Sequence, residues 1–243
     1  MALSALRSRL RLSPPLSSPP QQSLSAAHLL ESYQGGQRGF SGAVLRGIQL
    51  SSVNLWQVQL DQADLSMAIL NGANLGEGSF IEAILTEAHM RGTYLGKANL
   101  SQAHLERANL WQASLRGAEV QAAHFHHANL SGANLEQAQL QGSFLCEAQL
   151  WGANLRAAQL TGADLRGARL GGANLWRARL RNCDLSQVIF AQTDLSEVDL
   201  RGVCFGDADL SSCFLRGALY DEQTQFPGGF DPLKAGMRVV KRK

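Results

Sequence analysis

A large apolar residue occupies every fifth position of this chain from Leu45 to Tyr220, without one break in phase. Residues 41–220 hold 36 such positions, of which 29 are leucine, and the residue two positions earlier is alanine in 24 of the 36 pentads. The other central residues are Phe80, Met90, Val120, Phe125, Phe190, Phe205 and Tyr220. Self-similarity at a fixed short period indicates a repeat architecture, in which each unit packs mainly against its neighbours.

A period of five residues is incompatible with the common regular elements. On an α-helix, five residues rotate by about 140°, so the leucines would point in every direction. On a straight strand they would alternate between the two faces, because side chains there have a period of two. A chain that turns a corner every five residues can bury all of them, with the central residue and the one two before it pointing inward. The spacing predicts the corners but neither their number nor the handedness of the coil.

Ala-Asn-Leu and Ala-Asp-Leu motifs, as at residues 73–75 and 163–165, resemble the A(D/N)LXX pattern of the pentapeptide-repeat family in its cyanobacterial form. The resemblance implies an all-β fold, a right-handed, four-sided (quadrilateral) β-helix solenoid. With four sides of five residues, residues 41–220 would form about nine coils. Asparagine or aspartate between the two inward positions, as at Asn74, and glycine two after the leucine, as at Gly132, suit tight corners.

The segments that flank the repeat are expected to close its two ends, since an open solenoid end can stack on another copy. Residues 25–40 are interpreted as an N-terminal cap helix and lead-in, in which Ser25 suits the N-cap of a short helix and Gly35 its end. Residues 221–243 are expected to form a C-terminal cap followed by a basic tail.

Residues 1–24 contain no acidic residue and are rich in serine, proline and arginine. This composition favours a disordered N-terminal tail. Arginines beside serines are also typical of organellar transit segments, so a chloroplast location is the alternative to the expected cytoplasmic one.

Composition and motifs argue against several functional classes. The formal net charge of +2 is too small to indicate a nucleic-acid binder, and no apolar run is long enough to span a membrane. No phosphate loop, GxSxG or HExxH motif occurs, so we expect neither enzymatic activity nor a cofactor. The four cysteines form no CxxC pair; Cys183 and Cys213 hold small inward positions and are expected to be buried and unpaired.

Histidines form the first candidate site. His104 and Glu106 are offset by twenty residues from His124 and His126, so the four side chains should lie on one side of adjacent coils and face outward. Imidazole and carboxylate groups are common ligands of zinc and similar metals. The alternative is a solvated polar patch without a metal.

Tryptophans form the second candidate site. Trp56, Trp111, Trp151 and Trp176 each follow the central leucine directly, at a position that should face solvent. Trp111 and Trp151 would share one side two coils apart, whereas Trp56 and Trp176 would share the next side six coils apart. Exposed tryptophan is enriched in binding hot spots. The alternative is that each indole covers the neighbouring corners of the solenoid.

These features predict a non-catalytic scaffold that binds another protein, of unknown identity, along one side of the prism. One alternative is a DNA-mimic modulator of DNA gyrase or topoisomerase, because some members of the family resemble duplex DNA in width and negative surface. Residues 41–220, however, carry 16 acidic and 13 basic residues, and six arginines against Asp164 alone interrupt the acidic surface between residues 151 and 181. A metal-binding surface at the histidines is the other alternative, and a homodimer through an end cap is also open.

Overall fold

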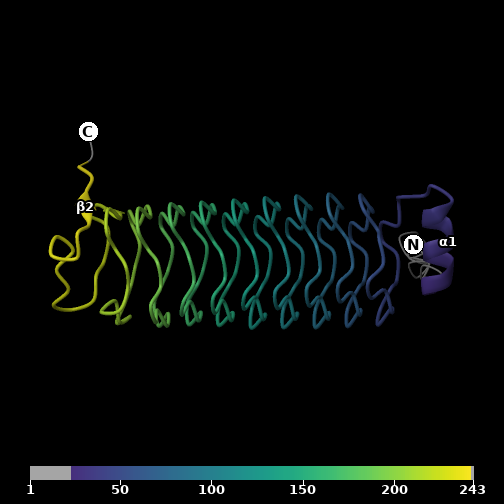
Figure 1. The fold of residues 1–243 in the computed structure, drawn as a ribbon, viewed down its shortest axis with the longest axis horizontal. Helices are drawn as coiled ribbons and strands as arrows, with labels where there is room; N and C mark the ends of the chain where they lie inside the picture. Colours follow the sequence, from purple (N-terminus) through teal and green to yellow (C-terminus); the bar gives the residue numbers. More distant parts are fainter. Residues whose placement is uncertain (1–22, 242–243) are drawn as a thin grey trace, which may run out of the picture.

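The computed structural model describes residues 23–241. Nearly every pentad repeats one local pattern, with two corner residues followed by three residues whose middle one forms a parallel bridge. The bridged residues are twenty positions apart, from Gly39 with Gln59 to Asp199 with Leu219. Four pentads therefore complete one turn of a parallel β-helix, which Figure 1 shows as a stack of similar coils along the long axis.

The core is the column of side chains enclosed by the coils. The central residue of nearly every pentad and the residue two before it are inside, as the period of five predicts; Ala103, Leu105 and Phe125, for example, are all 0% exposed. The exceptions are only partly buried and lie in the first and last coils: Ala43, Val53, Cys213 and Tyr220. Where a polar residue takes the small inward position, it bonds to the backbone. The Thr93 hydroxyl donates to the Leu70 carbonyl at 2.8 Å, which removes the penalty of burying it.

The second corner residue of most pentads has a positive φ, in the left-handed region. Glycine adopts this conformation without strain, as at Gly132 (φ 66°), but 21 non-glycine residues adopt it too, among them Gln112 (φ 55°) and Glu197 (φ 56°). None of these residues is β-branched. A left-handed L-residue already has its Cβ close to the following carbonyl, and branching at Cβ would add to that crowding.

The asparagines between the two inward positions do not lie at the corners, as predicted, but at the middle of a side. Asn74 sits at the middle of a side, where it forms bridges to both neighbouring coils. Its Oδ1 accepts a hydrogen bond from the N–H of Gly76 at 3.2 Å, at the start of the next corner. Its Nδ2 donates to Oδ1 of Asn54 in the preceding coil at 2.9 Å. Asparagine thus supports the corner from the side before it and joins adjacent coils.

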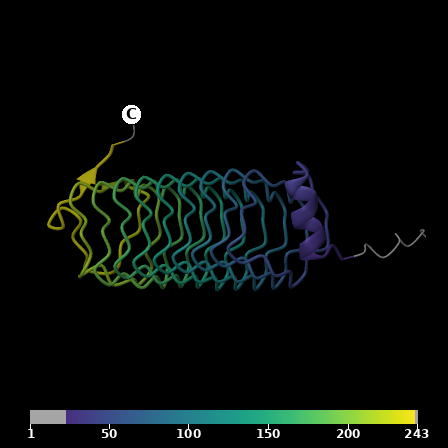
Figure 2. The same ribbon diagram turned by 45° about the vertical axis from the view of Figure 1, so that its right-hand side comes forward.

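One helix precedes the coils. Helix α1 spans Ala26–Gln34; the hydroxyl of Ser25, its N-cap, accepts a hydrogen bond from the N–H of His28 at 3.3 Å. Gly35 follows the helix, and its N–H donates to the Glu31 carbonyl at 2.9 Å. The helix lies across the end of the coiled segment, as Figures 1 and 2 both show.

Contacts attach α1 to the first coils. Leu29 is 0% exposed and belongs to the same core as the repeat leucines. The Tyr33 hydroxyl donates to the Trp56 carbonyl at 2.8 Å, and the N–H of Leu24, just before the helix, donates to the Val44 carbonyl at 3.1 Å. The remainder of the predicted N-terminal tail, residues 1–22, lies outside the described residues.

At the opposite end the chain returns to the last coil. Strand β1 (Leu219–Tyr220) pairs in parallel with strand β2 (Arg238–Val239). Between the strands, Phe226 stacks on Phe205 of the core at 5.6 Å and on Phe230 at 5.2 Å between ring centroids. Residues 242–243 of the predicted basic tail lie outside the described residues. Within residues 23–241 no helix is long and apolar enough to cross a membrane.

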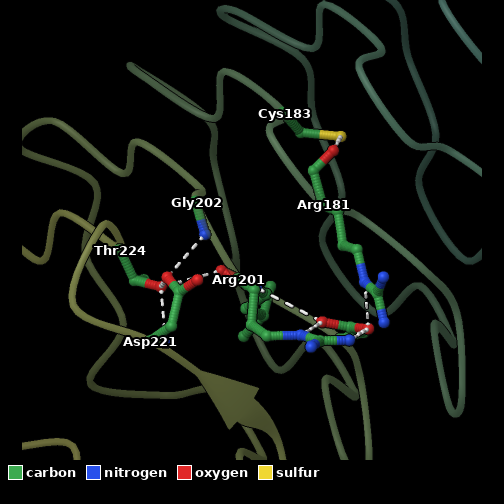
Figure 3. A network of polar contacts seen from close by, with 8 residues as sticks. Arg181, Cys183, Arg201, Gly202, Asp221 and Thr224 are labelled. Atoms are coloured by element: carbon green, nitrogen blue, oxygen red, sulfur yellow. Dashed lines mark hydrogen bonds and ion pairs between the residues drawn. The ribbon is translucent and has the colours of Figure 1, made fainter. Parts of the chain in front are cut away.

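Polar contacts also join the last coils (Figure 3). The Asp199 carboxylate, whose side chain is 9% exposed, accepts hydrogen bonds from Arg181 at 2.6 Å and from two nitrogens of Arg201 at 2.8 Å each. The Asp221 carboxylate in the C-terminal segment accepts from the N–H of Gly202 at 3.0 Å. Since carboxylates near the protein interior need such partners, these contacts hold the C-terminal segment against the preceding coils.

Candidate functional site: a histidine cluster and a row of tryptophans

Two histidines stack across adjacent coils. His104 and His124 are bridge partners, and their ring centroids lie 4.8 Å apart. Oε1 of Glu106 is 3.2 Å from Nδ1 of His104 and 3.8 Å from Nδ1 of His124. One ligand atom from each of these three residues lies within 4.8 Å of the others. His126 lies beside them, with its ring centroid 5.9 Å from that of His124. The structure therefore brings together three of the four predicted metal ligands, and we call these three the histidine cluster.

Neighbouring coils supply side chains around the histidine cluster. The Thr86 hydroxyl donates to Oε2 of Glu106 at 3.2 Å, which leaves Oε1 directed at the imidazoles. The Phe144 ring packs against His124 with centroids 4.8 Å apart, and Ile84 is the bridge partner of His104 on the other side. Sequence reasoning missed these three residues, although each is offset by twenty from a residue of the cluster and that offset could have found them.

Burial and hydrogen bonding act in opposite directions on the cluster's carboxylate. Partial burial raises the pKa of Glu106, but hydrogen bonds from its own backbone N–H, from His104 and from Thr86 outweigh it, so its pKa lies below the usual value. Burial lowers the pKa of His124, and the nearby His104 lowers it further. At neutral pH the wall of the solenoid therefore presents a charged carboxylate beside a neutral imidazole.

Two of the four tryptophans pack against a glycine of the next coil. A Cβ added at Gly171 would overlap the indole of Trp151, and one added at Gly76 would overlap that of Trp56. Tyr94 stacks on Trp56 with ring centroids 6.1 Å apart and an interplanar angle of 13°. Trp151 is 40% exposed, whereas Trp56 is half-buried. The structure thus combines both interpretations of these residues, because an indole that covers a corner still presents its outer face.

Arginines cover the other two indoles. The Arg91 guanidinium lies 4.1 Å from the ring centroid of Trp111. Trp176 is contacted by Arg156 at 4.5 Å and by Arg177 at 4.0 Å. Cation–π contacts of this kind stabilise a partly exposed ring. The ring of Trp176 is thus already covered by two arginine side chains. Trp151 is the most exposed of the four tryptophans.

Ion pairs connect the arginine-rich band to neighbouring acidic residues. Arg177 pairs with Glu197 of the next coil at 2.7 Å. Arg166 pairs with Asp164 at 2.6 Å, and its hydrogen bonds lower the pKa of that carboxyl to about 2. With the pair between Arg181 and Asp199, three of the six arginines of the band are thus joined to a carboxylate.

The cysteines are all unpaired, in agreement with the expectation for Cys183 and Cys213. Cys183 is 2% exposed, and its thiol donates to the Leu160 carbonyl at 2.9 Å. Cys213 is unpaired but only partly buried, so for this residue the prediction of burial is wrong. It lies near the last coils, where fewer layers cover the inward positions.

Comparisons with known proteins agree with the repeat geometry. The family profile of pentapeptide repeats matches the chain in eight copies, over residues 40–76, 83–121, 121–145, 138–177 and 178–217. No curated protein matches the chain.

Among solved structures, the chain is similar to HetL, a pentapeptide repeat protein involved in heterocyst differentiation regulation from the cyanobacterium Nostoc sp. strain PCC 7120. The identity is 31%, the match covers 80% of this chain and 92% of HetL, and the TM-score is 0.54. QnrB1, a plasmid-mediated fluoroquinolone resistance protein, matches at 16% identity over 83% of this chain and 89% of its own, with a TM-score of 0.45. On the profile matches and the likeness to HetL, this chain belongs to the pentapeptide repeat family and has its right-handed β-helix fold.

Proposed function

We propose that this protein is a non-catalytic scaffold that binds another protein through the corner of the β-helix that carries Trp111 and Trp151. The observation that carries the proposal is Trp151, an indole that is 40% exposed and packed against Gly171 of the next coil. A large ring in a fixed orientation loses little conformational entropy on binding, which is why tryptophan is frequent among interface hot spots.

The surroundings of this corner support its use as an interface. Trp111 lies two coils before Trp151 at the same corner of the β-helix, with Arg91 stacked on its ring. Tryptophan and arginine are both enriched at the centres of protein interfaces. Because the backbone ladder fixes the spacing of the coils, the two indoles are presented at a constant separation and need not be reorganised when a partner binds.

The test is affinity capture from a lysate of the source organism, with the full chain as bait. We expect at least one protein to be retained by the wild type and lost by the Trp111→Ala/Trp151→Ala double variant. Trp176→Ala is the matched control, since its ring is covered by two arginines and we expect that variant to retain the same protein. With the purified partner, the double variant should bind about 10-fold more weakly or worse. The proposed corner is wrong if the double variant retains everything that the wild type retains, or if the wild type retains nothing.

The DNA-mimic alternative has no comparable support. A mimic of duplex DNA needs a continuous negative face, whereas here arginines pair with carboxylates of neighbouring coils, as Arg177 does with Glu197. Unchanged supercoiling by DNA gyrase in the presence of excess protein would eliminate this alternative.

The proposal extends to the ends of the scaffold. Residues 41–220 supply nine coils, α1 caps the first, and residues 221–243 supply a C-terminal cap followed by the basic tail, which leaves the sides free for a partner. The burial of Leu29 in the common core supports the N-terminal cap. The protein would act in the cytoplasm. Native protein that begins after residue 24 would instead favour removal of a transit segment and the chloroplast alternative.

Removal of the N-terminal cap is expected to make the protein associate. A truncation that lacks residues 1–40 exposes the edge of the first coil, whose unpaired backbone groups can bond to another copy. We expect its mass, measured by light scattering during size-exclusion chromatography, to rise with concentration beyond that of the full chain. The matched control lacks only residues 1–22 and should behave as the full chain does. Equal masses for all three proteins would refute the capping role of α1.

A further inference from the structure

We propose that the histidine cluster is a binding site for one divalent transition-metal ion, such as Zn²⁺, held by Nδ1 of His104, Nδ1 of His124 and Oε1 of Glu106. The site is independent of the proposed protein-binding corner. Two imidazoles and one carboxylate suit zinc and its neighbours in the first transition series, whereas Mg²⁺ and Ca²⁺ prefer sites made of oxygen atoms.

Two of the three distances between the ligand atoms are close to those of a bound ion, and one nitrogen of each imidazole lies within 4.8 Å of the other. Three ligands about 2.0–2.2 Å from a tetrahedral zinc lie roughly 3.3 Å from one another. Oε1 of Glu106 is already 3.2 Å from Nδ1 of His104 and 3.8 Å from Nδ1 of His124. The three side chains are 45%, 29% and 33% exposed for His104, Glu106 and His124, so small χ rotations can close the remaining gap without disturbing the core. The exposed side of the cluster leaves room for water as a further ligand.

The backbone fixes the relative positions of the two histidines. The N–H of His124 donates to the Ala103 carbonyl at 2.9 Å, and the N–H of Leu105 donates to the His124 carbonyl at 2.8 Å. These two hydrogen bonds flank His104 and hold it opposite His124 in the parallel ladder. The ligands therefore come from two coils whose register is set by the whole repeat, so little of the binding energy is needed to assemble the site.

Side chains around the ligands give the support that metal sites usually have. Thr86 donates to Oε2 of Glu106 at 3.2 Å, which orients the carboxylate so that Oε1 points at the histidines. The Phe144 ring packs on His124, with centroids 4.8 Å apart, and restricts rotation of its imidazole. Side chains that contact and orient metal ligands strongly influence metal affinity, and a solvated patch has no need of them.

The protein contains a natural comparison for this cluster. His127 and Glu147 also pair across adjacent coils, with Nδ1 3.3 Å from Oε2, and their side chains are 51% and 68% exposed. That pair has the same histidine–carboxylate distance but no second imidazole within the ligand group. A difference in metal affinity between the histidine cluster and this pair would therefore show what the third ligand contributes.

The experiment is a titration of the metal-free full chain with Zn²⁺ alone, followed by calorimetry or by competition with a chromophoric chelator. Three variants each remove one ligand: His104→Asn, His124→Asn and Glu106→Gln. His127→Asn is the matched control. A Cys146→Ser/Cys204→Ser double variant tests whether these two of the three half-buried thiols, rather than the cluster, bind the ion. Thermal unfolding of each metal-free variant checks that these surface changes leave the fold intact.

We expect one Zn²⁺ per wild-type chain and, for each ligand variant, an affinity lower by about 10-fold or more, since even loss of a residue that only orients a ligand costs that much. The His127→Asn and cysteine variants should bind as the wild type does. Zn²⁺ should also raise the melting temperature of the wild type and not that of His124→Asn, because an ion that binds only the native state stabilises it. The absence of stoichiometric binding, equal affinities for the wild type and ligand variants, or loss of binding only in the cysteine variant would overturn the proposal.

Discussion

Replacement of Phe125 by alanine is expected to lower the free energy of unfolding by about 3–5 kcal/mol, which is the usual cost of removing a buried phenylalanine. Phe125 is 0% exposed and is among the largest fully buried side chains of the core. The coils on both sides are held by the backbone ladder, as in the hydrogen bond from the N–H of Phe125 to the Phe144 carbonyl at 2.7 Å. The walls therefore cannot move inward to fill the space, and a cavity remains in place of the ring.

Urea unfolding followed by circular dichroism measures this loss, with the shape of the transition checked because solenoids do not always unfold in one step. Gln149→Ala is the matched control, since Gln149 is an exposed side chain at the middle of a side, and its replacement should change stability by less than about 0.5 kcal/mol. If Phe125→Ala were as mild as this control, the account of the core given above would be incorrect.

The thiol of Cys183 is expected to be almost inert in the native protein. Burial raises its pKa from 9.0 to about 12, and the thiolate is the form that reacts with alkylating reagents. At pH 8 this shift alone reduces the thiolate fraction about 1000-fold, because each pKa unit is a factor of ten. Burial of the sulfur adds a steric barrier, so labelling of Cys183 should require opening of the last coils or global unfolding.

The raised pKa of Cys183 also determines how its contribution to folding stability depends on pH. Folding favours the protonated thiol, so this contribution to stability is complete below pH 9 and is lost as the pH rises from about 9 toward about 12. The measurement is alkylation at pH 8 with and without denaturant, with each site identified by peptide mass spectrometry. Half-buried Cys204 is the internal control in the same sample and should label much faster. Equal native labelling rates for Cys183 and Cys204 would show that the predicted register of the last coils is wrong.

The period of five residues determined which side chains are inside, because no regular element except a chain with repeated corners can bury one residue in five. It also placed His104 over His124 once four sides were assumed, since residues twenty apart then lie in adjacent coils. The side-chain contacts that support the corners were harder to predict from the sequence. The pattern could not show that asparagine acts from the middle of a side, because that depends on where its side chain reaches, as Asn74 reaches the N–H of Gly76.

The sequence by itself therefore determined which side chains form the core and to which family the chain belongs. It also determined which outward side chains lie above one another in successive coils. Only the tertiary structure decided which outward side chains touch: that Glu106 turns toward His104 and His124 while His126 lies beside them, and that Trp151 rests on Gly171. The physical reason is that burial depends on position along the backbone, which the repeat fixes, whereas contacts on the wall depend on side-chain rotamers. Those rotamers are selected by neighbours in the coils above and below, which are distant in the sequence.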